Sequence, residues 1–226
     1  MKRLLPLLFL GPALPLTAHD SEIPIGIEIV TGYRSDYVYR GFSLADNLIE
    51  IQIGGEVALS NQWLLDFGGW YGTGSDDFGE FSGSLGIRYD QDSWDAGFDA
   101  AWRSYENSFF NDGFDFGPFF NWRPNADWRI GSAVSYDTGP DGWYGEVEAE
   151  WSKPVGNSSF LSILGGASAV SNYYGRDGLN DFYSRLGYTY GVNDSVAFTP
   201  FVGASVPLYS GGSTRLFAGL WFEVNF

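Results

Sequence analysis

Seven segments of this chain carry two aromatic residues at one spacing, the second eight positions after the first. The pairs are Trp63/Tyr71, Phe81/Tyr89, Trp94/Trp102, Phe114/Trp122, Trp128/Tyr136, Trp143/Trp151 and Phe182/Tyr190. Positions an even number apart share one face of a β-strand, and eight residues rise about 26 Å. On a strand tilted by about 40°, this rise is roughly 20 Å along a membrane normal. The spacing therefore predicts strands that cross an apolar band of about 25 Å, with aromatic residues at both of its edges.

Alternation of apolar and polar residues extends this pattern over nearly the whole chain. In one run, Trp63, Leu65 and Phe67 share a face, and Asp66 lies on the opposite face. Twelve runs alternate in this way: 25–39, 48–59, 63–72, 80–89, 94–103, 113–122, 128–137, 143–151, 160–170, 181–191, 196–206 and 214–226. Run 160–170 is the least distinct, because its two faces are nearly alike. We expect an all-β fold, a transmembrane antiparallel up-and-down β-barrel of about twelve strands.

The first 18 residues have the composition of a signal peptide. Lys2 and Arg3 precede an apolar stretch that ends at Leu16, and Ala18 offers a small residue for cleavage before His19. A transmembrane helix is the alternative, but the stretch is too short and three prolines interrupt it. We expect residues 1–18 to be removed on export, and residues 19–226 to form the barrel in a Gram-negative outer membrane.

The face opposite the aromatic residues is polar and charged, which predicts a lumen. The candidate lumen-lining residues are Arg34, Asp36, Glu50, Glu56, Asp66, Arg88, Asp99, Arg103, Arg129, Glu146, Glu148, Glu150, Arg185 and Arg215. A soluble β-sandwich or lipocalin would also alternate. It would not need paired aromatic residues at a fixed spacing on one face and charges on the other, so the membrane barrel is favoured.

The connections between strands alternate between short ones and generally longer ones. The longer set is 40–47, 72–79, 104–112, 137–142, 171–180 and 207–213. Outer-membrane barrels have short periplasmic turns and longer outer loops, so we expect this set outside and both termini in the periplasm. Outer-membrane lipid and lipopolysaccharide are then the expected surroundings. The last strand ends at Phe226, which resembles the signal read by the barrel assembly machinery.

Residue types suited to catalysis are scarce. The chain has no Cys, and its single His is His19, beside the predicted cleavage site. Nucleophilic catalysis would need a Ser or Thr with a carboxylate or Lys base, and Lys153 lies in a predicted periplasmic turn. We therefore predict no enzymatic activity, no cofactor and no metal site. The balance of 28 Asp and Glu against 12 Lys and Arg also argues against a nucleic-acid partner.

Residues 31–47 read Thr-Gly-Tyr-Arg-Ser-Asp-Tyr-Val-Tyr-Arg-Gly-Phe-Ser-Leu-Ala-Asp-Asn. This stretch resembles the opening of the barrel in the TorF-type porin family, also called Gcw-chp. The matching residues are Ser35, Asp36, Tyr37, Tyr39, Arg40, Gly41 and Ser43. The resemblance implies an outer-membrane porin and leaves its solute open. Read physically, Arg34, Asp36 and Arg40 should share the lumen face of the first strand, and Gly41 should permit a tight exit into the first outer loop.

The sequence leaves three functions open. The first is a narrow diffusion channel for small polar solutes, preferring cations because the inward face holds more acids than arginines. The second is a non-conducting structural or interaction barrel. Inward rings that would narrow a passage favour it: Trp70, Phe119, Phe201, Phe217 and Trp221. The third, less favoured, is a lipid-acting enzyme.

Two local features also allow more than one interpretation. Glu146, Glu148 and Glu150 form an acidic track, a ladder of ion pairs, or both together. The arginines expected in such a ladder are Arg88, Arg103, Arg129 and Arg185. Phe109-Phe110 and Tyr173-Tyr174 either fold inward as a constriction, stack on a sugar, or pack a loop against the rim.

Overall fold

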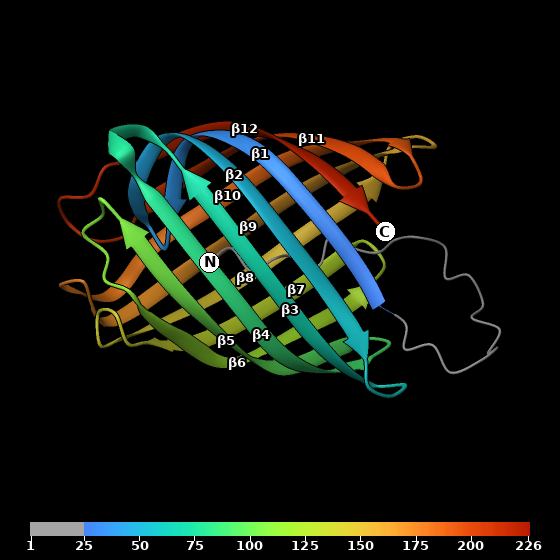
Figure 1. Cartoon of the computed structure of the whole chain (residues 1–226), viewed down its shortest axis with the longest axis horizontal. Helices are drawn as coiled ribbons and strands as arrows, with labels where there is room; N and C mark the ends of the chain where they lie inside the picture. The colour runs from blue at the N-terminus through green and yellow to red at the C-terminus, as the bar shows by residue number, and fades with distance from the viewer. Residues whose placement is uncertain (1–24) are drawn as a thin grey trace.

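The computed structural model describes residues 25–226, which form one closed antiparallel barrel (Figure 1). Its strands are β1 (Ile25–Tyr39), β2 (Phe42–Ala58), β3 (Trp63–Thr73), β4 (Gly79–Gln91), β5 (Trp94–Glu106), β6 (Gly113–Asn125), β7 (Trp128–Asp137), β8 (Gly142–Pro154), β9 (Ser159–Tyr173), β10 (Arg176–Asn193), β11 (Val196–Pro207) and β12 (Arg215–Asn225). A 3₁₀ turn, η1 (Ser75–Asp77), follows β3. The predicted all-β barrel of twelve strands is confirmed. The predicted signal peptide and His19 lie outside the described residues.

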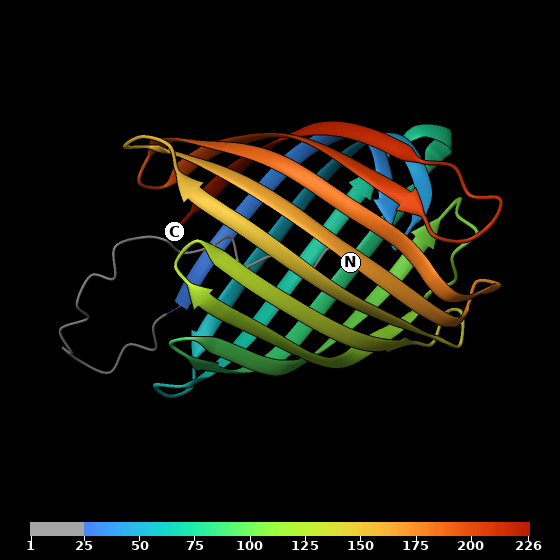
Figure 2. The same ribbon diagram turned by 180° about the vertical axis from the view of Figure 1, so that it is seen from behind.

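Neighbours in the sequence are neighbours in the sheet, and β1 pairs with β12 to close it. Seven pairs join these two strands, from Glu28↔Asn225 to Arg34↔Gly219. The start of β1 and the end of β12 therefore lie at one end of the barrel (Figures 1 and 2). We call this the periplasmic end and the opposite one the outer end. Within residues 25–226, no helix is long and apolar enough to span a bilayer.

The predicted aromatic pairs become two rows on the outside of the barrel. The residues of neighbouring pairs are directly opposed: Trp63↔Tyr89, Trp94↔Trp122 and Trp128↔Trp151 in one row, and Tyr71↔Phe81, Trp102↔Phe114 and Tyr136↔Trp143 in the other. Several of these rings touch, with centroids 5.1 Å apart for Trp63 and Tyr89 and 4.9 Å for Trp102 and Phe114. Between the rows the exterior is apolar, and Phe98 is 47 % exposed. An apolar exterior on a closed sheet is what a lipid environment requires.

Two predicted outer loops are largely strand instead. The predicted loop 171–180 shrinks to the turn Tyr174–Gly175, because β9 and β10 extend toward each other. Their pairing shifts register twice between Arg176 and Phe182, and Gly178 has a φ of +92°. These irregularities break the period-two pattern. The alternation of residues therefore did not indicate a strand over this stretch. The predicted loop 40–47 is likewise wrong, because β2 begins at Phe42 rather than at residue 48.

Candidate functional site: the lumen and the inward hairpin

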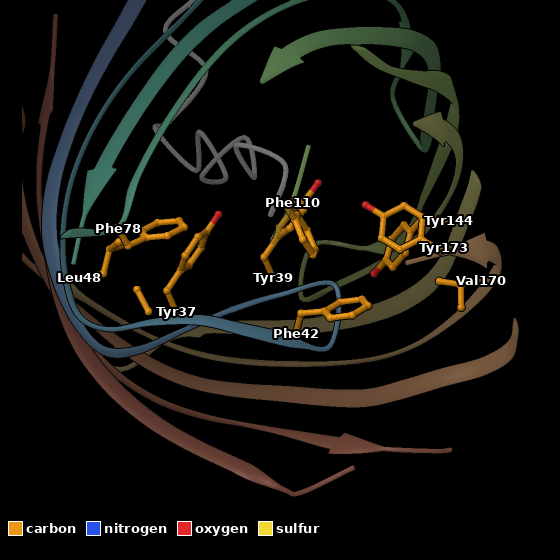
Figure 3. Close-up of a cluster of buried hydrophobic side chains, with 10 residues drawn as sticks. Tyr37, Tyr39, Phe42, Leu48, Phe78, Phe110, Tyr144, Val170 and Tyr173 are labelled. Carbon is orange, nitrogen blue, oxygen red and sulfur yellow. The ribbon is translucent and has the colours of Figure 1, made fainter. Parts of the chain in front are cut away.

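Residues 35–47, here called the inward hairpin, leave the barrel wall and enter the lumen (Figure 3). The pairing of β1 with β12 stops at Arg34, and the pairing of β2 with β3 starts at Ile49. Between these points the two strands pair only with each other, through Asp36↔Asp46, Tyr37↔Ala45, Val38↔Ser43 and Tyr39↔Phe42. This segment contains all seven residues of the family motif. The motif therefore builds a lumen element, not the exit into an outer loop.

A tight turn forms the tip of the inward hairpin. Arg40 and Gly41 both adopt left-handed backbone, with φ of +50° and +76°. Two successive residues with positive φ suit the right-handed twist of a two-residue hairpin. A β-carbon on Gly41 would lie 2.8 Å from the Asn180 side-chain nitrogen, so this position has no room for one. The tight turn expected at Gly41 is present, but it points into the barrel.

The Arg40 side chain extends from the tip to the opposite wall. Its guanidinium donates to Asp115 at 2.5 Å, Ser135 at 3.0 Å, Asp137 at 3.3 Å and Tyr173 at 2.8 Å. These partners lie on β6, β7 and β9. The expectation that Arg40 shares the lumen face of β1 with Arg34 and Asp36 is wrong, because the chain has turned by that point. Asp36 lies at the base of the hairpin, accepting from Ser43 and lying 3.8 Å from Arg215.

Further side chains attach the inward hairpin to the wall. Tyr37 donates to Glu80 of β4 at 2.9 Å, and Arg103 of β5 donates to the Tyr39 hydroxyl. From β10, Asn180 donates to the Arg40 carbonyl at 2.8 Å. The contacts thus run around the barrel from β4 to β10. Tyr37, Tyr39 and their partners are nearly inaccessible to solvent, so the hairpin narrows the outer end of the lumen.

Aromatic side chains from two outer connections cover the inward hairpin. Phe42 packs within 6.2 Å of the rings of Phe109, Phe110, Tyr173 and Tyr174. Phe110 and Tyr174 stack with centroids 4.1 Å apart. Burial raises the pKa of Tyr174 to about 12. Phe110 and Tyr173 fold inward and are buried in the cluster (Figure 3), whereas Phe109 is 57 % exposed, so only part of these two aromatic pairs lies inside the barrel.

The predicted lumen arginines have specific partners. Arg34 donates to Glu50 at 3.0 Å, Arg88 to Glu56 at 2.7 Å and Asp66 at 3.0 Å, and Arg129 to Glu148 at 2.8 Å and Glu150 at 3.1 Å. Arg103 lies 2.9 Å from Asp115 and 4.0 Å from Glu80. Arg185 lies over the Trp221 ring at 4.7 Å.

The possible ladder along Glu146, Glu148 and Glu150 is therefore only partly present. Of the four arginines expected in it, only Arg129 makes ion pairs with these glutamates among the described contacts. Glu146 instead accepts from the hydroxyls of Tyr144 at 3.0 Å and Tyr183 at 2.9 Å. Arg88 and Arg103 lie three or four strands from β8, too far for an arginine side chain to reach these glutamates, and instead contact carboxylates one or two strands away.

Beneath the inward hairpin, the lumen holds a cavity of about 220 Å³. It extends from the periplasmic part of β1 at Gly26 to the underside of the hairpin at Tyr39 and Arg40. Eight carboxylates line it: Glu28, Glu56, Asp66, Asp95, Asp99, Glu146, Glu148 and Asp181. Four arginines line it: Arg40, Arg88, Arg129 and Arg185. The cavity is therefore lined by twice as many acids as bases.

Some predicted lumen residues lie away from this cavity, and some cavity residues were not predicted. Arg34, Glu50, Arg103 and Glu150 are buried in ion pairs within the wall lining. Asp181, which was not among the predicted lumen residues, is 2 % exposed in the lumen. It accepts from Ser205 at 2.8 Å and from Ser168. The register shifts at the start of β10 interrupt the alternation of inward and outward residues, so the sequence did not indicate that Asp181 faces the lumen.

The sequence matches no protein-family model and no curated protein. Solved structures share the fold. The KdgM porin has a TM-score of 0.59 at 7% identity, over 89% of this chain and 99% of that chain. The NanC porin has a TM-score of 0.57 at 10% identity, over 88% and 98%. The COG4313 outer membrane channel from Pseudomonas putida F1 has a TM-score of 0.58 at 9% identity, over 95% and 100%.

These similarities concern the fold, which is that of outer-membrane barrels of porin type. Together with the apolar exterior of the barrel, they place the protein in the bacterial outer membrane.

Proposed function

We propose that the protein is a porin-like channel for passive diffusion of small polar solutes, with a preference for cations. The observation that supports this most directly is the twofold excess of carboxylates over arginines around the lumen cavity. A narrow passage between low-dielectric walls concentrates the field of its lining charges. An excess of one sign therefore raises the local concentration of the opposite ion.

Several of these carboxylates have neutral hydrogen-bond donors. Asp181 accepts from two serine hydroxyls, and Glu146 accepts from two tyrosine hydroxyls. Hydroxyl donors stabilise a carboxylate without cancelling its charge. These two residues are therefore suited to attract a passing cation.

Removing these two charges should reduce the selectivity. In the double variant Glu146→Gln and Asp181→Asn, we expect the cation-to-anion permeability ratio of open channels to fall about two- to fivefold. Such a change corresponds to roughly 0.4–1 kcal/mol of ion–carboxylate interaction, reasonable for two charges in a water-filled lumen. Reversal potentials across planar bilayers under a salt gradient measure the ratio.

The control removes two charges outside the lumen. Asp76→Asn with Asp77→Asn changes the exposed 3₁₀ turn η1 and should leave the ratio unaltered. A wild-type channel that favours anions, or equal effects of the two double variants, would contradict the proposal.

The inward hairpin favours a second candidate, a non-conducting structural barrel. The hairpin and the buried aromatic cluster around it take up part of the lumen at the outer end (Figure 3). Liposome swelling with small sugars separates the candidates. The structural barrel would admit no sugar even after the hairpin is released from the wall.

We propose that the protein is not an enzyme, because the sequence offers neither a Cys nor a His beyond His19. We also propose membership of the TorF-type family, on the motif residues of the inward hairpin. Contacts with lipopolysaccharide and with the barrel assembly machinery through Phe226 remain predictions from the sequence. The solutes of the similar porins are not assigned to this chain.

A further inference from the structure

The barrel wall itself forms a receptor for the Arg40 guanidinium. Its members, which we call the guanidinium pocket, are Asp115 on β6, Ser135 and Asp137 on β7, Tyr144 on β8 and Tyr173 on β9. None of these residues belongs to the inward hairpin. The pocket is therefore built by the wall, and the inward hairpin supplies only its occupant.

The guanidinium pocket matches the shape and charge of its occupant. Two carboxylates and two hydroxyls accept from the planar group, and such charge-assisted contacts are the strong ones. The faces of Tyr144 and Tyr173 lie 4.4 and 5.4 Å from the guanidinium carbon, within cation–π range. An ammonium group lacks the planar fork that engages several acceptors at once.

The guanidinium pocket has binding capacity that Arg40 leaves unused. Asp115 is 8 % exposed, and its Oδ1 atom has no hydrogen-bond partner among the described residues. Both Arg40 and Arg103 approach the other oxygen, Oδ2, at 2.5 and 2.9 Å. The Nε atom of Arg40 also lacks a partner. A guanidinium not tied to a backbone could reorient to use both oxygens of Asp115, which Arg40 does not.

Arg40, which occupies the guanidinium pocket, lies on a segment that can move away from the wall. The inward hairpin has no strand pairing with the wall, and its two strands pair with each other. At its base, the Ser35 hydroxyl accepts from the Ala218 N–H at 3.0 Å in place of a strand ladder. Side-chain contacts at the tip therefore hold the hairpin in the lumen, and the largest group of them involves Arg40.

We propose that the guanidinium pocket is a binding site for guanidinium-bearing solutes, occupied at rest by the protein's own Arg40. A solute guanidinium that takes the pocket displaces Arg40 and frees the inward hairpin, which opens the outer end of the lumen. The opening step rests on the proposed channel function, whereas the binding step does not. Because a tethered Arg40 acts at an effective concentration in the millimolar range, the solute must be present at similar levels.

Planar-bilayer recordings with methylguanidinium on the outer side test this proposal, with methylammonium as the matched control ion. In the wild-type protein, methylguanidinium should raise the open probability at least about tenfold, and methylammonium should not. The Arg40→Ala variant should be open without added ligand. In that variant the pocket is empty and lines the passage, so methylguanidinium should instead reduce the current. Equal responses to the two ions in both proteins would overturn the proposal.

A second measurement does not depend on conduction. Methylguanidinium should raise the urea midpoint of Arg40→Ala, since a ligand that binds only the folded state stabilises it, and methylammonium should not. The variant Arg40→Ala with Asp115→Asn should lose this rescue. If methylguanidinium raises the urea midpoint but no variant conducts, the proposed binding site is supported and the proposed channel function is wrong. Absence of rescue by methylguanidinium overturns the site.

A disulfide lock tests the movement of the inward hairpin. A β-carbon on Gly74 would lie 2.8 Å from that of Ala45, closer than the roughly 3.8 Å of a disulfide, so the bond forms only if the two segments move apart by about 1 Å. The chain contains no other cysteine, so Ala45→Cys with Gly74→Cys gives one defined bond. Oxidised, this variant should not open with methylguanidinium, and reduction should restore opening. Opening of the oxidised form would contradict displacement of the hairpin.

Discussion

Replacing Glu50 by alanine should lower the free energy of unfolding by about 3–5 kcal/mol, the cost of leaving a buried charge without its partner. Glu50 is 3 % exposed and accepts from Arg34 at 3.0 Å and from the indole nitrogens of Trp70 and Trp221, both at 2.8 Å. The substitution leaves one guanidinium and two indole N–H groups without this acceptor. Urea unfolding from lipid vesicles, followed by tryptophan fluorescence, measures the change.

Glu56 on the same strand provides a matched control. Its side chain is 40 % exposed, and its partner Arg88 keeps a second carboxylate, Asp66, at 3.0 Å. Exposed ion pairs contribute about 0–1 kcal/mol, so Glu56→Ala should have a small effect. Arg34→Met combined with Glu50→Leu removes both charges and should be more stable than Glu50→Ala alone. Equal losses for Glu50→Ala and Glu56→Ala would contradict the assigned role of Glu50.

The second large loss of stability is expected when an arginine replaces a residue on the lipid-facing side of the barrel. Phe98 lies on the outside of β5, midway between Trp94 and Trp102 of one aromatic pair. At the middle of the apolar band, an arginine costs about 2–4 kcal/mol, and near the interface about 0–1 kcal/mol. We therefore expect Phe98→Arg to lose about 2–4 kcal/mol of stability in vesicles.

Val155 is the control position for this experiment. It is 49 % exposed in the turn between β8 and β9, beyond the band. Val155→Arg should change the stability by less than about 1 kcal/mol. If Phe98→Arg costs no more than Val155→Arg, the exterior of the barrel does not face hydrocarbon.

The barrel was predictable because its pattern is local and repeated. Whether a strand crosses the membrane depends on alternation within about ten residues, and the aromatic pairs mark both ends of the crossing. The cross-strand registers of Trp94↔Trp122 and Tyr136↔Trp143 confirm this prediction. The ends of the strands were less predictable. At Gly178 a left-handed residue interrupts β10, and no period-two pattern survives the interruption.

The inward hairpin was not predicted, because its direction is set by distant partners. Arg40 contacts Asp115 and Asp137, which lie 75 and 97 positions further along the chain. The alternation of apolar and polar residues along one strand carries no information about contacts between residues so far apart in the chain. A signal was nevertheless present, since Tyr37, Tyr39 and Phe42 place large rings around a segment that would otherwise face water. Three aromatic residues within six positions of a predicted loop entry favour a packed element over a solvated loop.

The chain order of the contacts at the tip of the inward hairpin has a consequence for biogenesis. Arg40 is synthesised early, yet Asp115, Asp137 and Asn180 follow it by 75, 97 and 140 residues. The segment around Arg40 therefore cannot gain these contacts until the later strands have been inserted. An unfinished barrel leaves residues 35–47 without these contacts and open to proteases, whereas a finished one shields them. Resistance to cleavage at this segment thus distinguishes completed molecules from stalled ones.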